Sequence, residues 1–162
     1  MDKEKQFLKL LEENQQRIQK LCSMYAKTKE NQKDLMQEVV LNIWKSFSSY
    51  RGEAALNTWV YRVILNVCLK KTYALKKEKT VPLEHLDFEP IHHAVNPTEK
   101  FSALRACIQQ LDFSDRSIII LFLEELSYRE IGKVIGISEN YVAVKIKRIK
   151  KKLGICLNKK EI

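Results

Sequence analysis

The stretch of sequence that decides the fold is SYREIGKVIGISENYVAVKIKRIKKKL, residues 127–153. Ser127 is followed three residues later by Glu130, which is the pattern of a capping box at the start of a helix. Gly136 can end that helix, and Ser138 can cap a second one after the small apolar spacer Ile137. The pattern therefore predicts two helices joined by a tight turn.

The second predicted helix has one apolar face and several basic ones. Its apolar stripe, spaced by three or four residues, consists of Val142, Ile146, Ile149 and Leu153. Its basic residues are Lys145, Lys147, Arg148, Lys150, Lys151 and Lys152. A lysine-rich face can simply be solvated, but so many like charges beside a capped turn favour a polyanionic partner. We interpret the stretch as a helix-turn-helix whose second helix enters the major groove of DNA.

In this interpretation the start of the second helix reads bases and its middle holds phosphates. The predicted base-reading residues are Glu139, Asn140, Tyr141, Ala143 and Val144, and the predicted phosphate-binding residues are Lys145, Lys147 and Arg148. An asparagine can pair with adenine and apolar groups can touch thymine methyl groups, whereas lysine and arginine position a protein on the DNA backbone.

The chain is small and basic, with 162 residues, a formal net charge of +9 and a pI near 9.4. Nucleic acid is the partner that this charge balance favours. No apolar run approaches the roughly 20 residues that span a bilayer, and the charged N-terminus lacks the apolar core of a signal peptide. We therefore expect a cytoplasmic protein.

The four cysteines, Cys22, Cys68, Cys107 and Cys156, are scattered singly along the chain. Because there is no close pair and no histidine at ligand spacing, the pattern predicts neither a zinc site nor a disulfide framework. We expect at least the first three to be small core residues. The sequence predicts no metal site and no cofactor.

Apolar periodicity predicts three helices before residue 79, the third of them over residues 56–73. The expected core stripes are Phe7, Leu10, Leu11, Ile18, Leu21, Cys22 and Tyr25; then Leu35, Met36, Val39, Val40, Ile43, Trp44 and Phe47; then Trp59, Val60, Val63, Ile64 and Val67. The periodicity stops between residues 80 and 95, which indicates a linker.

After the linker, Asn96 and Pro97 can restart a helix, and Ser114 is expected to cap a very apolar helix that runs to Leu126. The predicted fold is all-α, with two small helical domains joined by a flexible linker, the second ending in the helix-turn-helix. The expected boundaries are 1–79 for the first domain, 80–95 for the linker and 96–162 for the second domain.

Two separated blocks of the chain resemble the extracytoplasmic-function (ECF) class of bacterial sigma factors. Residues 34–44, DLMQEVVLNIW, resemble the polymerase-binding helix of the family, and residues 50–66, YRGEAALNTWVYRVILN, resemble its promoter-melting segment. The second block is LSYREIGKVIGIS, residues 126–138, with the basic helix after it. Because order, spacing and domain sizes all fit, the resemblance covers nearly the whole chain.

The resemblance implies that the first domain binds core RNA polymerase and the −10 promoter element, while the second binds the −35 element. The implied polymerase-binding residues are Asp34, Gln37, Glu38, Leu41 and Asn42. The implied −10 residues are Tyr50, Arg51, Gly52, Trp59, Arg62, Asn66 and Lys70. The implied −35 residues are Ser138, Glu139, Asn140, Tyr141, Val144, Lys145, Lys147 and Arg148. We expect Trp59 to belong to the core rather than to act as a wedge in DNA, because it lies on the apolar phase of its helix.

A sigma subunit has no chemistry of its own, and the family further implies an anti-sigma factor as a partner. The chain also departs from the family pattern. Lys70 stands where the family usually has aspartate, and Tyr141, Ala143 and Val144 replace its frequent threonine, lysine and serine. The promoter sequence therefore cannot be carried over from relatives.

Two other classes of protein share parts of this pattern. A stand-alone helix-turn-helix regulator would bind duplex DNA without polymerase, usually as a dimer, but it has no reason to carry a melting segment. An enzyme acting on DNA would need carboxylates or a nucleophile converging on a metal or phosphate. Glu124 and Glu125 are adjacent and diverge on a helix, so we expect no catalytic residues.

Overall fold

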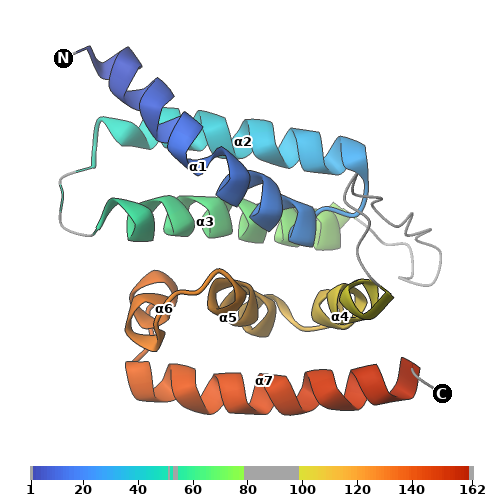
Figure 1. Cartoon of the computed structure of the whole chain (residues 1–162). Helices are drawn as coiled ribbons and strands as arrows, with labels where there is room; N and C mark the ends of the chain where they lie inside the picture. The colour runs from blue at the N-terminus through green and yellow to red at the C-terminus, as the bar shows by residue number, and fades with distance from the viewer. Residues whose placement is uncertain (1, 51, 53–54, 79–98, 161–162) are drawn as a thin grey trace. The chain divides into compact units, whose positions relative to one another are not determined.

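The computed structural model describes residues 2–50, 52, 55–78 and 99–160. This part of the chain forms two compact units, one built from helices α1 to α3 and the other from helices α4 to α7 (Figure 1). Every regular element in the described ranges is a helix, which confirms the all-α prediction. No helix among these residues is both long and apolar enough to cross a membrane.

The first unit is a bundle of three helices, α1 (Lys3–Tyr25), α2 (Lys29–Phe47) and α3 (Leu56–Glu78). The side chains of Asp2 and Thr28 cap the first two helices by accepting hydrogen bonds from backbone amides of the first turn. The shared core includes the fully buried Leu21, Val39, Ile43, Val60 and Ile64. The helix α3 runs to Glu78 rather than to Tyr73, because the residues after Tyr73 are good helix formers.

Two residues of the first unit differ from the predicted core stripes. Trp44 is 38% exposed, so its assignment to the core was wrong. The centre of its ring lies 4.8 Å from the centre of the Phe7 ring. Asn14 is 3% exposed although it is polar. Its side chain can be buried because it donates to the Leu10 carbonyl and accepts from Arg17, both at 2.9 Å.

The second unit contains α4 (Glu99–Gln109), α5 (Phe113–Leu123), α6 (Tyr128–Ile135) and α7 (Glu139–Lys160). The predicted helix-turn-helix is present as α6 and α7, with both hydrogen bonds of the capping box between Ser127 and Glu130. Gly136 ends α6 with φ +87°, and Gly132 allows the turn to close. A Cβ on Gly132 would lie 2.6 Å from the carbonyl oxygen of Ile137.

The start and end of α5 correct the prediction. The cap is Asp112, whose carboxylate accepts from the Asp115 amide at 2.8 Å, and not Ser114. Asp112 precedes Ser114, so the helix already begins at Phe113. The helix also ends at Leu123, before Leu126, because the chain turns at Glu125 with φ +67°. The proposed restart at Asn96 and Pro97 lies outside the described residues.

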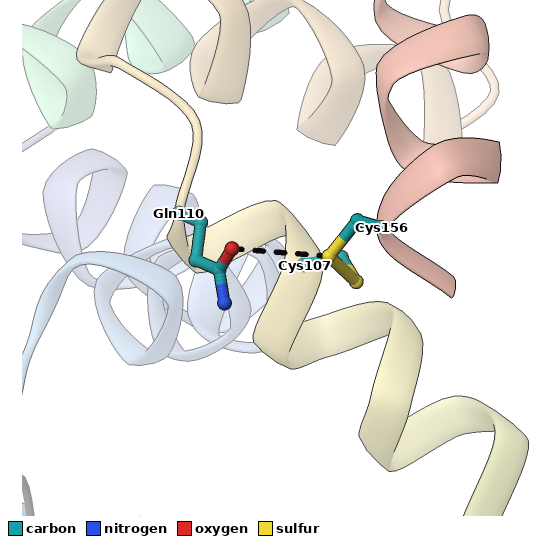
Figure 2. Close-up of a disulfide and its surroundings, with 3 residues drawn as sticks. All are labelled: Cys107, Gln110 and Cys156. Atoms are coloured by element: carbon teal, nitrogen blue, oxygen red, sulfur yellow. Dashed lines mark hydrogen bonds between the residues drawn. A yellow bond between two sulfur atoms is a disulfide. The ribbon is translucent and has the colours of Figure 1, made fainter. Parts of the chain in front are cut away.

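A disulfide joins Cys107 of α4 to Cys156 of α7, with 5.9 Å between their Cα atoms (Figure 2). The expectation that the chain forms no disulfide was therefore wrong. The two cysteines are 49 residues apart in sequence, and only the packing of α4 against α7 brings them together. Cys107 lies in the core as predicted, and the Oε1 atom of Gln110 lies 3.8 Å from the Cys156 sulfur.

Cys22 and Cys68 are free thiols buried in the first unit, as predicted. A hydrogen bond with Cys22 and burial both raise the pKa of Cys68 well above its ordinary value. The Cys68 thiol is therefore protonated and poorly reactive at neutral pH.

Reduction of the Cys107–Cys156 disulfide should lower the stability of the second unit. We expect a loss of about 2 to 4 kcal/mol, because opening the loop returns conformational entropy to the unfolded chain. Thermal unfolding followed by circular dichroism, with and without dithiothreitol, measures this effect. The Cys156→Ser variant is the control: its melting temperature should be low and insensitive to reductant. Equal melting temperatures for the oxidised and reduced wild type would contradict the prediction.

Candidate nucleic-acid interface

The first turn of α7 is held in place and presents its side chains outward. Ser138 caps the helix, because its Oγ accepts from the Tyr141 amide at 3.1 Å. The residues predicted to read bases here, Glu139, Asn140, Tyr141 and Val144, are exposed, and Ala143 is half-buried. The opposite side of the same turns is occupied by the buried Val142 and Ile146. The structure therefore places the predicted reading residues on a surface that the described residues of their own unit leave uncovered.

Tyr141 and Val144 are large apolar side chains, and each is 46% exposed. They lie three residues apart and therefore on neighbouring positions of one helix face. Apolar groups on such a face can contact thymine methyl groups in a major groove. The start of α7 therefore exposes both apolar side chains and the polar side chains of Glu139 and Asn140.

The basic residues of α7 divide into two groups. Lys147, Arg148, Lys150 and Lys151 are exposed, and the Nζ atom of Lys150 lies 4.6 Å from the centre of the Phe122 ring. Lys145 and Lys152 bind the buried carboxylate of Asp115 in α5, a residue that the sequence did not single out; the Lys145 side chain is 23% exposed and that of Lys152 is 59% exposed. Their Nζ atoms lie 3.1 Å from Oδ1 and 3.0 Å from Oδ2 of Asp115, respectively. Lys145, predicted as a phosphate contact, is thus engaged inside the unit, whereas Lys147 and Arg148 face outward.

The electrostatics of this pair of bonds are consistent with its geometry. Burial raises the pKa of the Asp115 carboxyl, but the hydrogen bonds from Lys152 and Lys145 outweigh burial and hold that pKa below its ordinary value. The same contact raises the pKa of Lys145. The Asp115 carboxyl and the Lys145 ammonium group are therefore both charged at neutral pH. In the sequence, the only indication of this contact is that Asp115 is an acidic residue in the first turn of a very apolar helix. Such a residue by itself indicates only a favourable interaction with the helix N-terminus.

The predicted −10 residues occupy α3 and the segment before it. The ring of Tyr50 lies 5.2 Å from that of Trp59, which also packs against Phe47 at 6.5 Å. Trp59 is half-buried in this aromatic cluster and is not one of the buried core residues, so its packing with Tyr50 and Phe47 leaves part of its ring accessible. Gly52 is exposed and adopts a φ of +78°, whereas Arg51 lies outside the described residues.

Three further −10 candidates recur along one side of α3. Arg62, Asn66 and Lys70 are spaced by four residues and are all exposed. Residues four apart lie one above another on a helix, so these side chains form a single polar row. The row lies on the opposite side of the helix from the buried Val60, Ile64 and Val67.

The predicted polymerase-binding residues lie on α2 beside a shallow, mostly apolar groove. Asp34, Gln37 and Leu41 are exposed, while Glu38 and Asn42 are half-buried and joined by a hydrogen bond from Asn42 Nδ2 to the Glu38 carbonyl at 2.7 Å. The groove is lined by Phe7, Met36, Gln37, Val40, Leu41 and Trp44. Two of the predicted residues, Gln37 and Leu41, therefore form part of its wall.

The described residues contain no cluster of three histidine, cysteine or acidic side chains that could hold a metal ion.

The family models and the relatives that match this chain all belong to the same family. The model of sigma-70 region 2 matches residues 10–79, and that of sigma-70 region 4 matches residues 101–153. The ECF RNA polymerase sigma factor SigM of Mycobacterium tuberculosis is 23% identical over 149 residues, which cover 91% of this chain and 75% of the relative. The RNA polymerase sigma factor SigV of Bacillus subtilis is 24% identical over 151 residues, covering 93% and 90%.

Solved structures show the same fold. The sigma factor RpoE from Bartonella quintana, crystallised with the anti-sigma factor NepR, has a TM-score of 0.80 at 17% identity and covers 95% of this chain and 98% of its own. CnrH, solved with the cytosolic domain of CnrY, has a TM-score of 0.70 at 17% identity, with coverages of 96% and 89%.

Helical units that match both region 2 and region 4 define a sigma subunit of bacterial RNA polymerase, and this chain belongs to the sigma-70 family. Within that family it is a member of the ECF group. It is an alternative sigma factor, which binds core RNA polymerase and directs it to specific promoters.

Neutralising Lys147 or Arg148 should weaken DNA binding through the loss of phosphate contacts. For Lys147→Gln and Arg148→Gln we expect the slope of log K against log salt concentration to become shallower by about 0.9 per variant. Fluorescence anisotropy of a labelled duplex over a sodium chloride series gives this slope. Lys9→Gln, an exposed lysine of α1, is the charge-matched control and should leave the slope unchanged. Identical slopes for all three variants would argue against a phosphate-binding role.

Proposed function

We propose that the two units divide promoter recognition between them. Residues 1–79 would form the region 2 domain, which binds core polymerase and the −10 element, and residues 96–162 the region 4 domain, which binds the −35 element, with residues 80–95 as the linker. The observation that carries this proposal is the first turn of α7, which is capped by Ser138 and whose side chains at Glu139, Asn140 and Tyr141 are exposed among the described residues. The matches of the family models to residues 10–79 and 101–153 support the division.

For the −35 element, α7 lies in the major groove with its first turn against the bases. Glu139, Asn140, Tyr141 and Val144 supply hydrogen bonds and apolar contacts, and Lys147 and Arg148 bind the phosphates on either side. Ser138 acts by fixing the first turn. The N-terminus of α7 also favours a nearby phosphate through its unpaired amides and dipole.

For the −10 element, a base leaves the duplex and is held in the segment before α3. Extruding a base costs a few kcal/mol, which stacking and hydrogen bonding must offset. Tyr50, Arg51 and Gly52 belong to this segment, and the Trp59 ring packs against that of Tyr50 at 5.2 Å. The row of Arg62, Asn66 and Lys70 on α3 supplies polar and cationic contacts to the separated strand.

Core polymerase binds the groove between α1 and α2. Leu41 is 45% exposed and Trp44 is 38% exposed, and together with the other apolar groove residues they form a patch that a partner would cover. Asp34 and Glu38 place negative charge on the same helix, and this charge favours a basic partner surface. Gln37 and Asn42 add polar groups to the rim.

The chain itself carries out no reaction, since phosphodiester synthesis belongs to the polymerase. We place it in the cytoplasm, where polymerase and genomic DNA are found. We also propose an anti-sigma factor as a further partner, by analogy with the complex of RpoE and NepR.

A charged residue in the groove should weaken polymerase binding without unfolding the protein. For Leu41→Asp we expect at least a tenfold weaker affinity for core polymerase, equivalent to about 1.4 kcal/mol or more, because the carboxylate loses its hydration inside the interface. Leu8→Asp is the matched control, because Leu8 is 55% exposed and does not line the groove. Equal affinities of both variants in a native gel or surface plasmon resonance assay would contradict the assignment of the groove.

Run-off transcription tests the proposed function as a whole. Purified bacterial core polymerase should produce defined transcripts from a genomic fragment library only when this protein is added. The start sites would then give the −10 and −35 sequences directly. If no transcript appears while the protein binds duplex DNA tightly on its own, a stand-alone DNA-binding regulator would be the better description.

A further inference from the structure

The buried carboxylate of Asp115 binds two lysines of the DNA-facing helix at once. Asp115 lies in the first turn of α5, and its side chain is 3% exposed. Lys145 and Lys152 are seven residues apart on α7, which places their Cα atoms about 10 Å apart along the helix axis. Each ammonium group reaches a different oxygen of the same carboxylate, at 3.1 and 3.0 Å.

This arrangement changes how many charges of α7 are available to DNA. Six lysine and arginine residues lie between residues 145 and 152 of α7, and Asp115 binds two of them. A phosphate contact adds affinity for any DNA sequence and carries no information about the bases. Withholding two lysines therefore lowers the part of the affinity that is the same for every DNA sequence.

Lys145 also connects Asp115 to Tyr141 in the first turn of α7. Its Nζ atom lies 5.8 Å from the centre of the Tyr141 ring, within the range of a cation–π contact. Only 23% of the Lys145 side chain is exposed, so the carboxylate fixes the position of the ammonium group beside the ring. Tyr141 is the largest exposed side chain among the residues that we place against the bases.

Stability alone does not explain the presence of these charges. The neighbours of Asp115 in α5 include the buried Ser117, Ile118 and Ile119, and an apolar residue could fill such a site. Replacing a buried ion pair with well-packed apolar side chains is often neutral or stabilising. A role in recognition gives a reason for keeping one carboxylate between two lysines.

We propose that Asp115 is a specificity-determining residue: it withholds Lys145 and Lys152 from DNA phosphates and positions Lys145 beside Tyr141. The inference rests on the proposed contact of α7 with DNA. It assigns a role in promoter discrimination to a residue that lies in another helix and is buried from solvent.

The test is the salt dependence of DNA binding by the full-length chain, with a labelled duplex of random sequence as the probe. In Asp115→Asn the released lysines should reach phosphates, so the slope of log K against log salt concentration steepens by about 0.9 for each lysine released. Glu125→Gln removes one negative charge from an exposed position of the same unit and is the matched control. It should leave the slope unchanged. A folding defect alone would weaken binding without steepening the slope.

A second variant avoids any change to the buried carboxylate. Lys152→Gln leaves Asp115 bound to Lys145, and it should keep the wild-type slope because Lys152 is already withheld. For Lys147→Gln, measured in the same experiment, the slope of log K against log salt concentration should become shallower by about 0.9. Binding to a promoter duplex obtained from run-off mapping completes the test. Asp115→Asn also frees Lys145 from its position beside Tyr141, so the ratio of promoter to random binding should fall in this variant and not in Glu125→Gln.

Three results would overturn the proposal. They are an unchanged slope in folded Asp115→Asn, a decrease in slope in Lys152→Gln equal to that in Lys147→Gln, and an unchanged ratio of promoter to random binding in Asp115→Asn. These results differ from a failure of the proposed function. A wild-type chain that binds neither duplex would contradict the contact of α7 with DNA and this inference with it, whereas a wild type that binds normally isolates the role of Asp115.

Discussion

The second unit depends on the burial of one stripe of α7. Val142, Ile146, Ile149 and Leu153 are between 0% and 6% exposed, and the helix packs against α4, α5 and α6 alike. Because a single helix supplies the shared core, its orientation fixes the rest of the unit. Burial of the stripe also decides which residues face outward, since the exposed side chains of the first turn and the exposed cations occupy the remaining faces of the same helix.

The turn before α7 sets the angle at which that helix leaves α6. The carbonyl oxygen of Gly132 accepts from the amides of Gly136 and Ile137 at 2.8 and 3.0 Å. No side chain larger than hydrogen fits at Gly132 without moving the Ile137 carbonyl. In the first unit the comparable constraint is the aromatic cluster of Phe47, Tyr50 and Trp59, which joins the end of α2 to the start of α3.

Local signals in the sequence predicted most of the helices and part of the interface. The capping box at Ser127, the cap at Ser138 and the glycine at residue 136 each act within a few residues, so their effect can be read from the chain alone. Helix ends were predicted less well. Asp112 rather than Ser114 caps α5, because both side chains can accept a hydrogen bond near the start of this helix. Trp44 is exposed because the apolar stripe of α2 includes more residues than the neighbouring helices cover.

The sequence by itself determined the all-α class, the two units, the helix-turn-helix and the exposed first turn of α7, since periodicity and capping depend on near neighbours in the chain. Only the tertiary structure decided the Cys107–Cys156 disulfide, the groove between α1 and α2, and the binding of Lys145 and Lys152 by Asp115. Each of these joins residues from different helices, between 30 and 49 positions apart for the disulfide and the two ion pairs. Their meeting depends on how the helices pack, and no local pattern of residues specifies that.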